Sequence, residues 1–140
     1  MPENKDLDVL VGRWRSEGGT TDDPPVRIAG WDTYEWMAGG FFLVHRVDVR
    51  MGGDRVEAIE MIGPYDPATG GYPMRSFDNG GGFVTMHATV DERGVWTFAG
   101  DAERATLVVG GDTMTATWER TDDGGATWRH WMDMTFTRES

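Results

Sequence analysis

The sequence predicts an all-β fold, an antiparallel up-and-down β-barrel of about ten strands with a short N-terminal helical turn. Turn-forming residues recur at short, regular intervals, and 20 of the 140 residues are glycines. The segments between these turns are rich in Val, Thr, Trp, Phe and Ile, which favour strands. Since the links are too short for crossover helices, neighbouring strands must be antiparallel.

The elements follow one another simply along the chain. A helical pattern covers only Asp6 to Val11, about one turn. The expected strands are Arg13–Gly18, Arg27–Met37, Phe41–Met51, Arg55–Tyr65, Tyr72–Phe77, Phe83–Val90, Val95–Ala99, Arg104–Val109, Thr113–Arg120 and Thr127–Thr137. Such a series leaves two free edges unless it closes, and closure at this strand number encloses space for one small ligand.

Length and composition predict one domain over residues 1–140. The first six residues are polar, so no signal peptide is expected, and no apolar run approaches the roughly 20 residues of a membrane span. The chain contains no cysteine, which excludes disulfides and thiolate metal sites and fits a reducing cytosol. We therefore expect a soluble, cytoplasmic protein with no membrane partner.

The charge and the aromatic content bear on the partner. A formal net charge of −11 would repel a phosphate backbone, so no nucleic-acid partner is expected. Seven Trp and nine Met are high counts for this length, and both residue types line adaptable cavities as well as cores. A barrel of this size does not need seven indoles to fill a solid core, which favours a pocket.

Alternation along the strands assigns side chains to the inner face. In Phe41–Met51 the more apolar face carries His45, and in Thr127–Thr137 the apolar face carries His130. The segment Arg55–Tyr65 is mixed on both faces, and Glu60 lies among apolar neighbours if its face is the interior. Polar groups of this kind are tolerated inside a hollow barrel, where ligand or water satisfies them.

The function predicted from these faces is the binding of a small hydrophobic or amphipathic molecule in the barrel interior. Burial of apolar ligand surface, at about 25 cal/mol per Å², supplies affinity. Inward polar groups supply orientation. The residues expected to line the pocket are Trp36, His45, Glu60, Met61, Arg75, Trp118, His130 and Met132.

Two alternatives stay open. As an enzyme, the protein would use His45 and Glu60 as catalytic candidates for cyclase or isomerase chemistry, because a buried carboxyl beside an imidazole transfers protons. As a barrel with a solid core, it would act through its surface as a homodimer. No metal site is predicted, because His45, His87 and His130 lie on three different strands without the spacing of a metal motif.

Four segments match a known family pattern, namely Leu10–Gly18, Tyr34–Leu43, Ile62–Gly70 and Met134–Arg138. In these segments the chain resembles the DUF1579 family, bacterial domains of unknown function placed among lipocalin-like, calycin-type barrels. The Gly12-x-Trp14 opening is shared by many barrels of this type, and the Tyr-Asp-Pro-x-Thr-Gly turn adds specificity. The resemblance implies a fold and no established reaction.

The opening segment also resembles that of nitrobindin-type haem barrels, in which a histidine on the last strand binds the iron. That resemblance implies a haem ligand at His130 if this residue points inward. A shift of one residue in register would put Trp131 there instead, because alternation reverses the face at each residue. Apart from this implied haem, no cofactor is expected.

Overall fold

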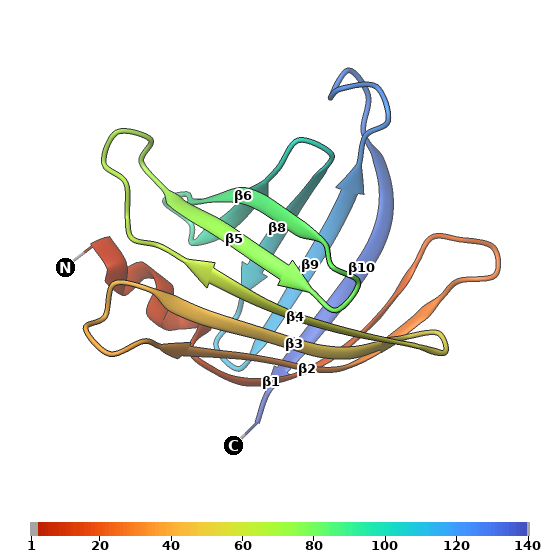
Figure 1. Cartoon of the computed structure of the whole chain (residues 1–140), viewed down its shortest axis with the longest axis horizontal. Helices are drawn as coiled ribbons and strands as arrows, with labels where there is room; N and C mark the ends of the chain where they lie inside the picture. Colours follow the sequence, from red (N-terminus) through yellow and green to blue (C-terminus); the bar gives the residue numbers. More distant parts are fainter. Residues whose placement is uncertain (1–2, 140) are drawn as a thin grey trace.

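The structure is a computed structural model that describes residues 3–139. Its elements are η1 (Glu3–Leu10), β1 (Gly12–Thr20), β2 (Arg27–Trp36), β3 (Leu43–Met51), β4 (Asp54–Ile62), β5 (Tyr72–Asp78), β6 (Phe83–Val90), β7 (Val95–Ala99), β8 (Glu103–Val109), β9 (Thr113–Arg120) and β10 (Arg129–Arg138). Each strand pairs with the next along the chain, and β1 pairs with β10 to close the barrel (Figure 1). The predicted fold and all ten predicted strands are confirmed.

The helix η1, a 3-10 helix, closes one end of the barrel. Leu7 and Leu10 are fully buried, and the indole of Trp14 donates a hydrogen bond to the Leu10 carbonyl at 2.8 Å. Tyr72 and Trp96 are buried in the same layer of the core. No helix within residues 3–139 is long and apolar enough to cross a bilayer. Because Leu7 and Leu10 pack into the core, the N-terminal segment is a plug that closes this end of the barrel.

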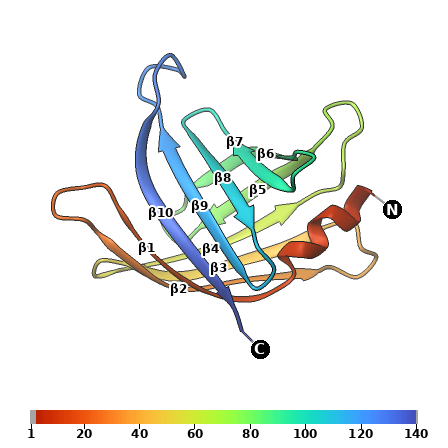
Figure 2. The same ribbon diagram turned by 180° about the vertical axis from the view of Figure 1, so that it is seen from behind.

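The opposite end is formed by hairpins. The β1–β2, β3–β4 and β5–β6 hairpins extend away from η1, and they do so in both opposite views (Figures 1 and 2). The two ends consequently differ: one is sealed by packed apolar side chains, and the other is bounded by turns. We refer to the second as the open end.

Two glycines let β1 and β2 approach their neighbours closely. A Cβ atom at Gly18 would lie 2.0 Å from the carbonyl oxygen of Asp133, and one at Gly30 would lie 2.2 Å from that of Asp48. No side chain fits at either position, so glycine is required there for the chain to bend around the barrel.

A β-bulge in β10 corrects one prediction. Register runs from His130 opposite Glu119 directly to Met132 opposite Trp118, so Trp131 is an extra residue. An inserted residue shifts the alternation of the strand, so the residues before the bulge face the side opposite to the one extrapolated from the rest of β10. His130 therefore lies on the outer face, where it is exposed, and its predicted inward orientation is wrong.

The burial of η1 leads to a prediction about the free energy of unfolding. Leu10→Ala removes a side chain that is 0% exposed and leaves a cavity, so we expect a loss of about 2–5 kcal/mol in the free energy of unfolding, measured with urea. Val9 is the matched control on the same helix, since it is 43% exposed; Val9→Ala should change that free energy by less than about 0.5 kcal/mol. Equal effects of the two substitutions would show that η1 does not seal the barrel.

Candidate functional site

A row of polar side chains lies at mid-depth inside the barrel. Ser16, Asp32, His45 and Glu60 come from β1, β2, β3 and β4, one from each strand. Ser16, Asp32 and Glu60 are buried, and His45 is mostly buried. Polar groups at such depth require partners inside the protein or from a ligand.

Strand register brings these four side chains together. His45 is directly opposite Glu60 in the β3–β4 pair. Asp32 is two residues from Tyr34, the partner of His45, and Ser16 is opposite Gly30, two residues from Asp32. Direct and diagonal cross-strand neighbours on one face are close enough for side chains to contact each other. The row is thus a consequence of the pairing of β1 to β4.

The four side chains form a continuous hydrogen-bonded network, which we call the polar row. The Ser16 hydroxyl donates to Asp32 Oδ1 at 2.5 Å. His45 Nε2 lies 2.6 Å from Asp32 Oδ2, and His45 Nδ1 lies 3.0 Å from Glu60 Oε1. A carboxylate beside each ring nitrogen favours the imidazolium form, in which both nitrogens donate.

The surroundings of His45 stabilise its charged form. Burial lowers the pKa of His45, but hydrogen bonds and charges from Asp32 and Glu60 outweigh burial and raise the pKa from 6.5 to about 9. The Tyr34 ring stacks on the imidazole with centroids 4.0 Å apart and planes 8° apart. Burial, followed by the charges of Asp32 and Glu60, raises the pKa of Tyr34 well above its usual value. At neutral pH the site therefore holds an imidazolium and a neutral phenol.

The polar row remains accessible from inside the barrel. The side chains of Asp32, His45 and Glu60 keep 9, 12 and 11% of their surface exposed, although all three point inward from the middle of their strands. Some inward side chains beyond the row are partly buried, namely Val47, Ala58, Met86, Trp118 and Met132, whereas Ile28 and Val49 are buried. The inner face beyond the row is thus apolar, and part of it is only partly buried.

Aromatic and charged groups lie at the open end. Arg120 shares the inner face with Trp118, forms an ion pair with Glu103 at 3.2 Å, and places its guanidinium 3.4 Å from the centre of the Trp131 ring. The Trp131 Nε1 atom is buried and has no hydrogen-bond partner among residues 3–139. Trp131, the bulge residue, thus lies against Arg120 with an unpaired indole donor.

A separate groove lies next to η1 at the rim of the barrel, and the inward-facing residues Val90, Trp96 and Val109 are part of its walls. Its volume is about 600 Å³, and its walls include Asp6, Val9, Arg93 and Arg138. This groove is at the sealed end of the barrel and does not include any member of the polar row.

Comparison with protein families decides the chain's classification. A family model described as "Protein of unknown function (DUF1579)" matches residues 1–138. The chain belongs to the DUF1579 family. No functionally curated protein sequence is significantly similar to it.

Solved structures share the fold of this DUF1579 protein at low sequence identity. Rv2717c from M. tuberculosis is 13% identical, with a TM-score of 0.72 over 100% of this chain and 99% of its own. The S-type phycobiliprotein lyase CPES from Guillardia theta is 10% identical, with a TM-score of 0.72 over 99% and 96%. The barrel EF1p2_mFAP2b bound to DFHBI is 10% identical, with a TM-score of 0.50 over 98% and 99%. At such identities the likeness concerns the fold alone.

The structure places half of the predicted pocket residues beside the polar row or the open end. His45, Glu60, Trp118 and Met132 all point into the barrel of the DUF1579 protein. Trp36 also shares the inner face, but it lies at the sealed end, where its indole donates to Asp8 at 2.8 Å. Trp36 is therefore part of the packing under η1.

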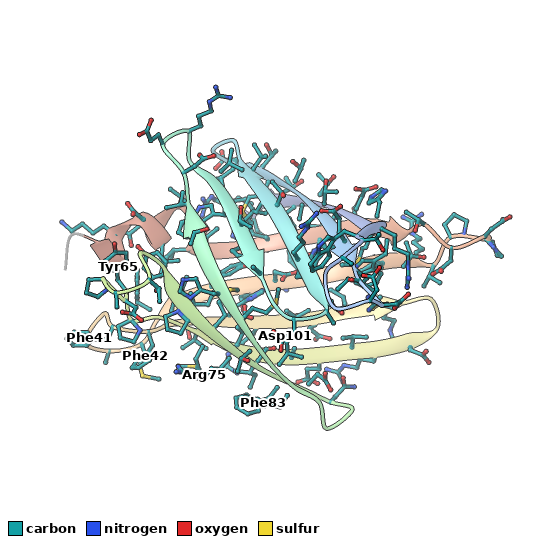
Figure 3. All side chains as sticks on the ribbon, turned by 90° about the horizontal axis from the view of Figure 1, so that it is seen from above. Phe41, Phe42, Tyr65, Arg75, Phe83 and Asp101 are labelled. Carbon is teal, nitrogen blue, oxygen red and sulfur yellow. The ribbon has the colours of Figure 1, made fainter. Side chains whose placement is uncertain are left out.

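The other three predicted pocket residues lie on the outside. Met61 and Arg75 are paired with each other on the outer faces of β4 and β5, and Figure 3 shows Arg75 pointing away from the barrel. Glu60 is the inward residue on β4, so its neighbour Met61 must face outward. His130 is turned outward by the bulge and lies 2.8 Å from Asp133. The predicted pocket roles of these three side chains are wrong.

Sequence reasoning missed three members of the site: Ser16, Asp32 and Tyr34. A signal for two of them exists, since Asp32 and Tyr34 have the same parity as Ile28 and Trp36 in β2, and an apolar face therefore carries one carboxylate. Ser16 alternates with Trp14 in β1 in the same way.

Neither metal nor haem fits the site. Within the described chain, no group of three or more His, Cys or Asp/Glu side chains is arranged to hold a metal ion. A haem held from the last strand would need His130 inside the barrel, whereas its side chain is 46% exposed on the outer face. His45 points inward, but carboxylates occupy both of its ring nitrogens. The haem expectation from the nitrobindin resemblance therefore does not fit these residues.

The polar row predicts an unusual histidine titration. We expect one imidazole, absent from spectra of His45→Gln, to titrate by NMR with a midpoint near pH 9. Because its pKa in the folded state exceeds that in the unfolded state, His45 stabilises the fold fully below about pH 6.5 and loses that contribution as pH rises through 9. The two pKa values differ by the equivalent of about 3 kcal/mol. A midpoint at or below 6.5 for His45 would contradict the network.

Proposed function

We propose that this DUF1579 protein binds a small amphipathic molecule inside the barrel, with its polar end at the polar row and its apolar body toward the open end. The observation that carries the proposal is the accessibility of Asp32, His45 and Glu60, which point inward from mid-strand and keep 9–12% exposure. Pockets that bind small molecules combine an apolar lining with a few polar groups in this way.

The apolar wall supports the same proposal. Eight strands suffice to hold one small ligand, and ten strands enclose a wider interior. The partly buried side chains above the row, Ala58, Trp118 and Met132 among them, would contact the body of the guest. Burial of about 200 Å² of apolar ligand surface contributes about 5 kcal/mol. The binding of DFHBI by EF1p2_mFAP2b, a barrel with the same fold, lends further support.

We also propose a setting for this activity. The net charge of −11 and the absence of cysteine support a small-molecule partner in a reducing cytoplasm, with no nucleic acid and no membrane involved. The apolar outer face of β5 and β6, where Phe77 stacks on Phe83, is the surface that a homodimer would cover.

The test is to fill the barrel with a larger side chain. Ala58 faces inward and Ile59, the next residue on β4, faces outward. We expect Ala58→Trp to weaken the binding of 1-octanol, measured by calorimetry, roughly tenfold or more, because the indole occupies the guest's space. Ile59→Trp is the matched control and should bind 1-octanol like the unmodified protein. Equal binding by both variants would place the alcohol outside the barrel, for example in the groove next to η1, and would contradict the proposal.

A second candidate function is proton transfer to or from the guest. The contact of His45 Nδ1 with Glu60 Oε1 at 3.0 Å favours it, since a carboxylate beside an imidazolium can accept a proton from a bound molecule. The similar fold of CPES, a lyase by name, also supports chemistry in such a barrel.

This second candidate predicts deuterium exchange into a bound ketone. With 2-octanone in D₂O, we expect deuterium at the carbons next to the carbonyl faster than in buffer, followed by NMR, and we expect Glu60→Gln to abolish the acceleration. Glu57→Gln, on the outer face of the same strand, is the control and should leave it unchanged. Exchange at the buffer rate in the unmodified protein would eliminate proton transfer.

A further inference from the structure

The polar row carries an unbalanced charge. It contains two carboxylates, Asp32 and Glu60, and a single imidazolium, His45, so its formal charge is −1 at neutral pH. The other charged pair on the inner face, Glu103 with Arg120 at the open end, is internally balanced. No lysine or arginine among residues 3–139 forms an ion pair with Asp32 or Glu60. A buried excess charge is costly unless a counter-charge approaches it.

The free acceptor of the row can be assigned to one atom. Both oxygens of Asp32 and both ring nitrogens of His45 are already engaged. Glu60 uses Oε1 for His45, while its Oε2 has no hydrogen-bond partner within the described residues and is not one of the sealed unpaired atoms. Glu60 Oε2 is therefore an acceptor without a protein donor, on a residue that is 8% exposed.

The neighbouring strand does not satisfy this oxygen. Ser76 on β5 is directly opposite Glu60 and shares its inward face. Its hydroxyl donates instead to the backbone carbonyl of Val84 at 3.4 Å. The protein therefore leaves one carboxylate oxygen of the inward-facing polar row without a donor.

We propose that the guest's polar end is a cationic nitrogen, a protonated amine or an amidinium, which donates to Glu60 Oε2 while an alkyl or aryl body contacts Trp118 and Met132. This inference rests on the proposed function and names its ligand class. An ammonium group supplies both what the row lacks, a positive charge and a hydrogen-bond donor. A carboxylate guest would meet a site of its own charge, and an alcohol would supply the donor without the charge.

The experiment compares three guests with the same alkyl chain and different polar ends. Octylamine, 1-octanol and octanoate are titrated into the protein at pH 7.5, with calorimetry as the measurement. We expect octylamine to bind roughly tenfold or more tightly than 1-octanol, since hydrogen bonds to charged groups are the stronger ones, and octanoate to bind most weakly.

Two variants distinguish binding of the amine at the polar row from binding to the acidic outer surface. Glu60→Gln removes the excess charge and keeps an amide oxygen for His45, so the amine and the alcohol should then bind with similar affinity. Glu57→Gln changes the net charge of −11 by the same amount on the exposed face of β4, so the preference for the amine should persist. Circular dichroism verifies that both variants keep the β-fold.

The remaining outcomes would contradict either the cationic guest or the proposed binding function. Equal binding of the three guests, or the tightest binding by octanoate, would overturn the cationic guest and leave the proposed binding function intact. A preference for octylamine that survives Glu60→Gln would trace it to surface charge and would also overturn the inference. Failure of all three guests to bind would overturn the proposed function itself.

Discussion

The structure depends on the ionic hydrogen bonds between Asp32, His45 and Glu60. They connect three neighbouring strands across the inner face, at a depth where an unpaired charge is expensive. Removal of one partner would leave the others uncompensated, which typically costs about 3–5 kcal/mol for a buried pair. The same contacts hold the imidazole in one orientation, parallel to the ring of Tyr34. Fold and site are consequently built on the same interactions.

The polar row lies between two barrel ends that differ in structure. At one end η1 buries Leu7 and Leu10 against the core of the barrel. At the other end the inward side chains Trp118 and Met132 stay partly exposed, Ile28 and Val49 are buried, and Arg120 stacks on Trp131. A row of polar side chains on an otherwise apolar inner face suits a molecule with one polar terminus. The excess carboxylate at Glu60 then determines which terminus fits.

Much of this arrangement could be predicted from sequence, because turn signals and alternation are local properties. The contact of His45 with Glu60 was also predictable in principle. The tight Gly52-Gly53 turn pairs Met51 with Asp54, and that register, continued along the hairpin, places His45 opposite Glu60. The β2–β3 connection is longer, so the sequence contains no comparable signal for the approach of Asp32 to His45.

The errors have a physical cause. A bulge inserts one residue into β10, and alternation alone cannot reveal it, so the apolar face extrapolated from Phe136 assigned His130 to the interior. In β4 and β5 both faces carry apolar residues, since Ile59 and Phe77 are exposed on the outside. Met61 and Arg75 could not be assigned from hydrophobicity there.

The most direct test of the account is a crystal structure of the protein grown with octylamine. We expect an elongated ligand inside the barrel, with its nitrogen within hydrogen-bond distance of Glu60 Oε2 and its chain against Trp118 and Met132. A structure in which side chains fill the space above Asp32, His45 and Glu60, or in which octylamine occupies only the groove next to η1, would contradict it.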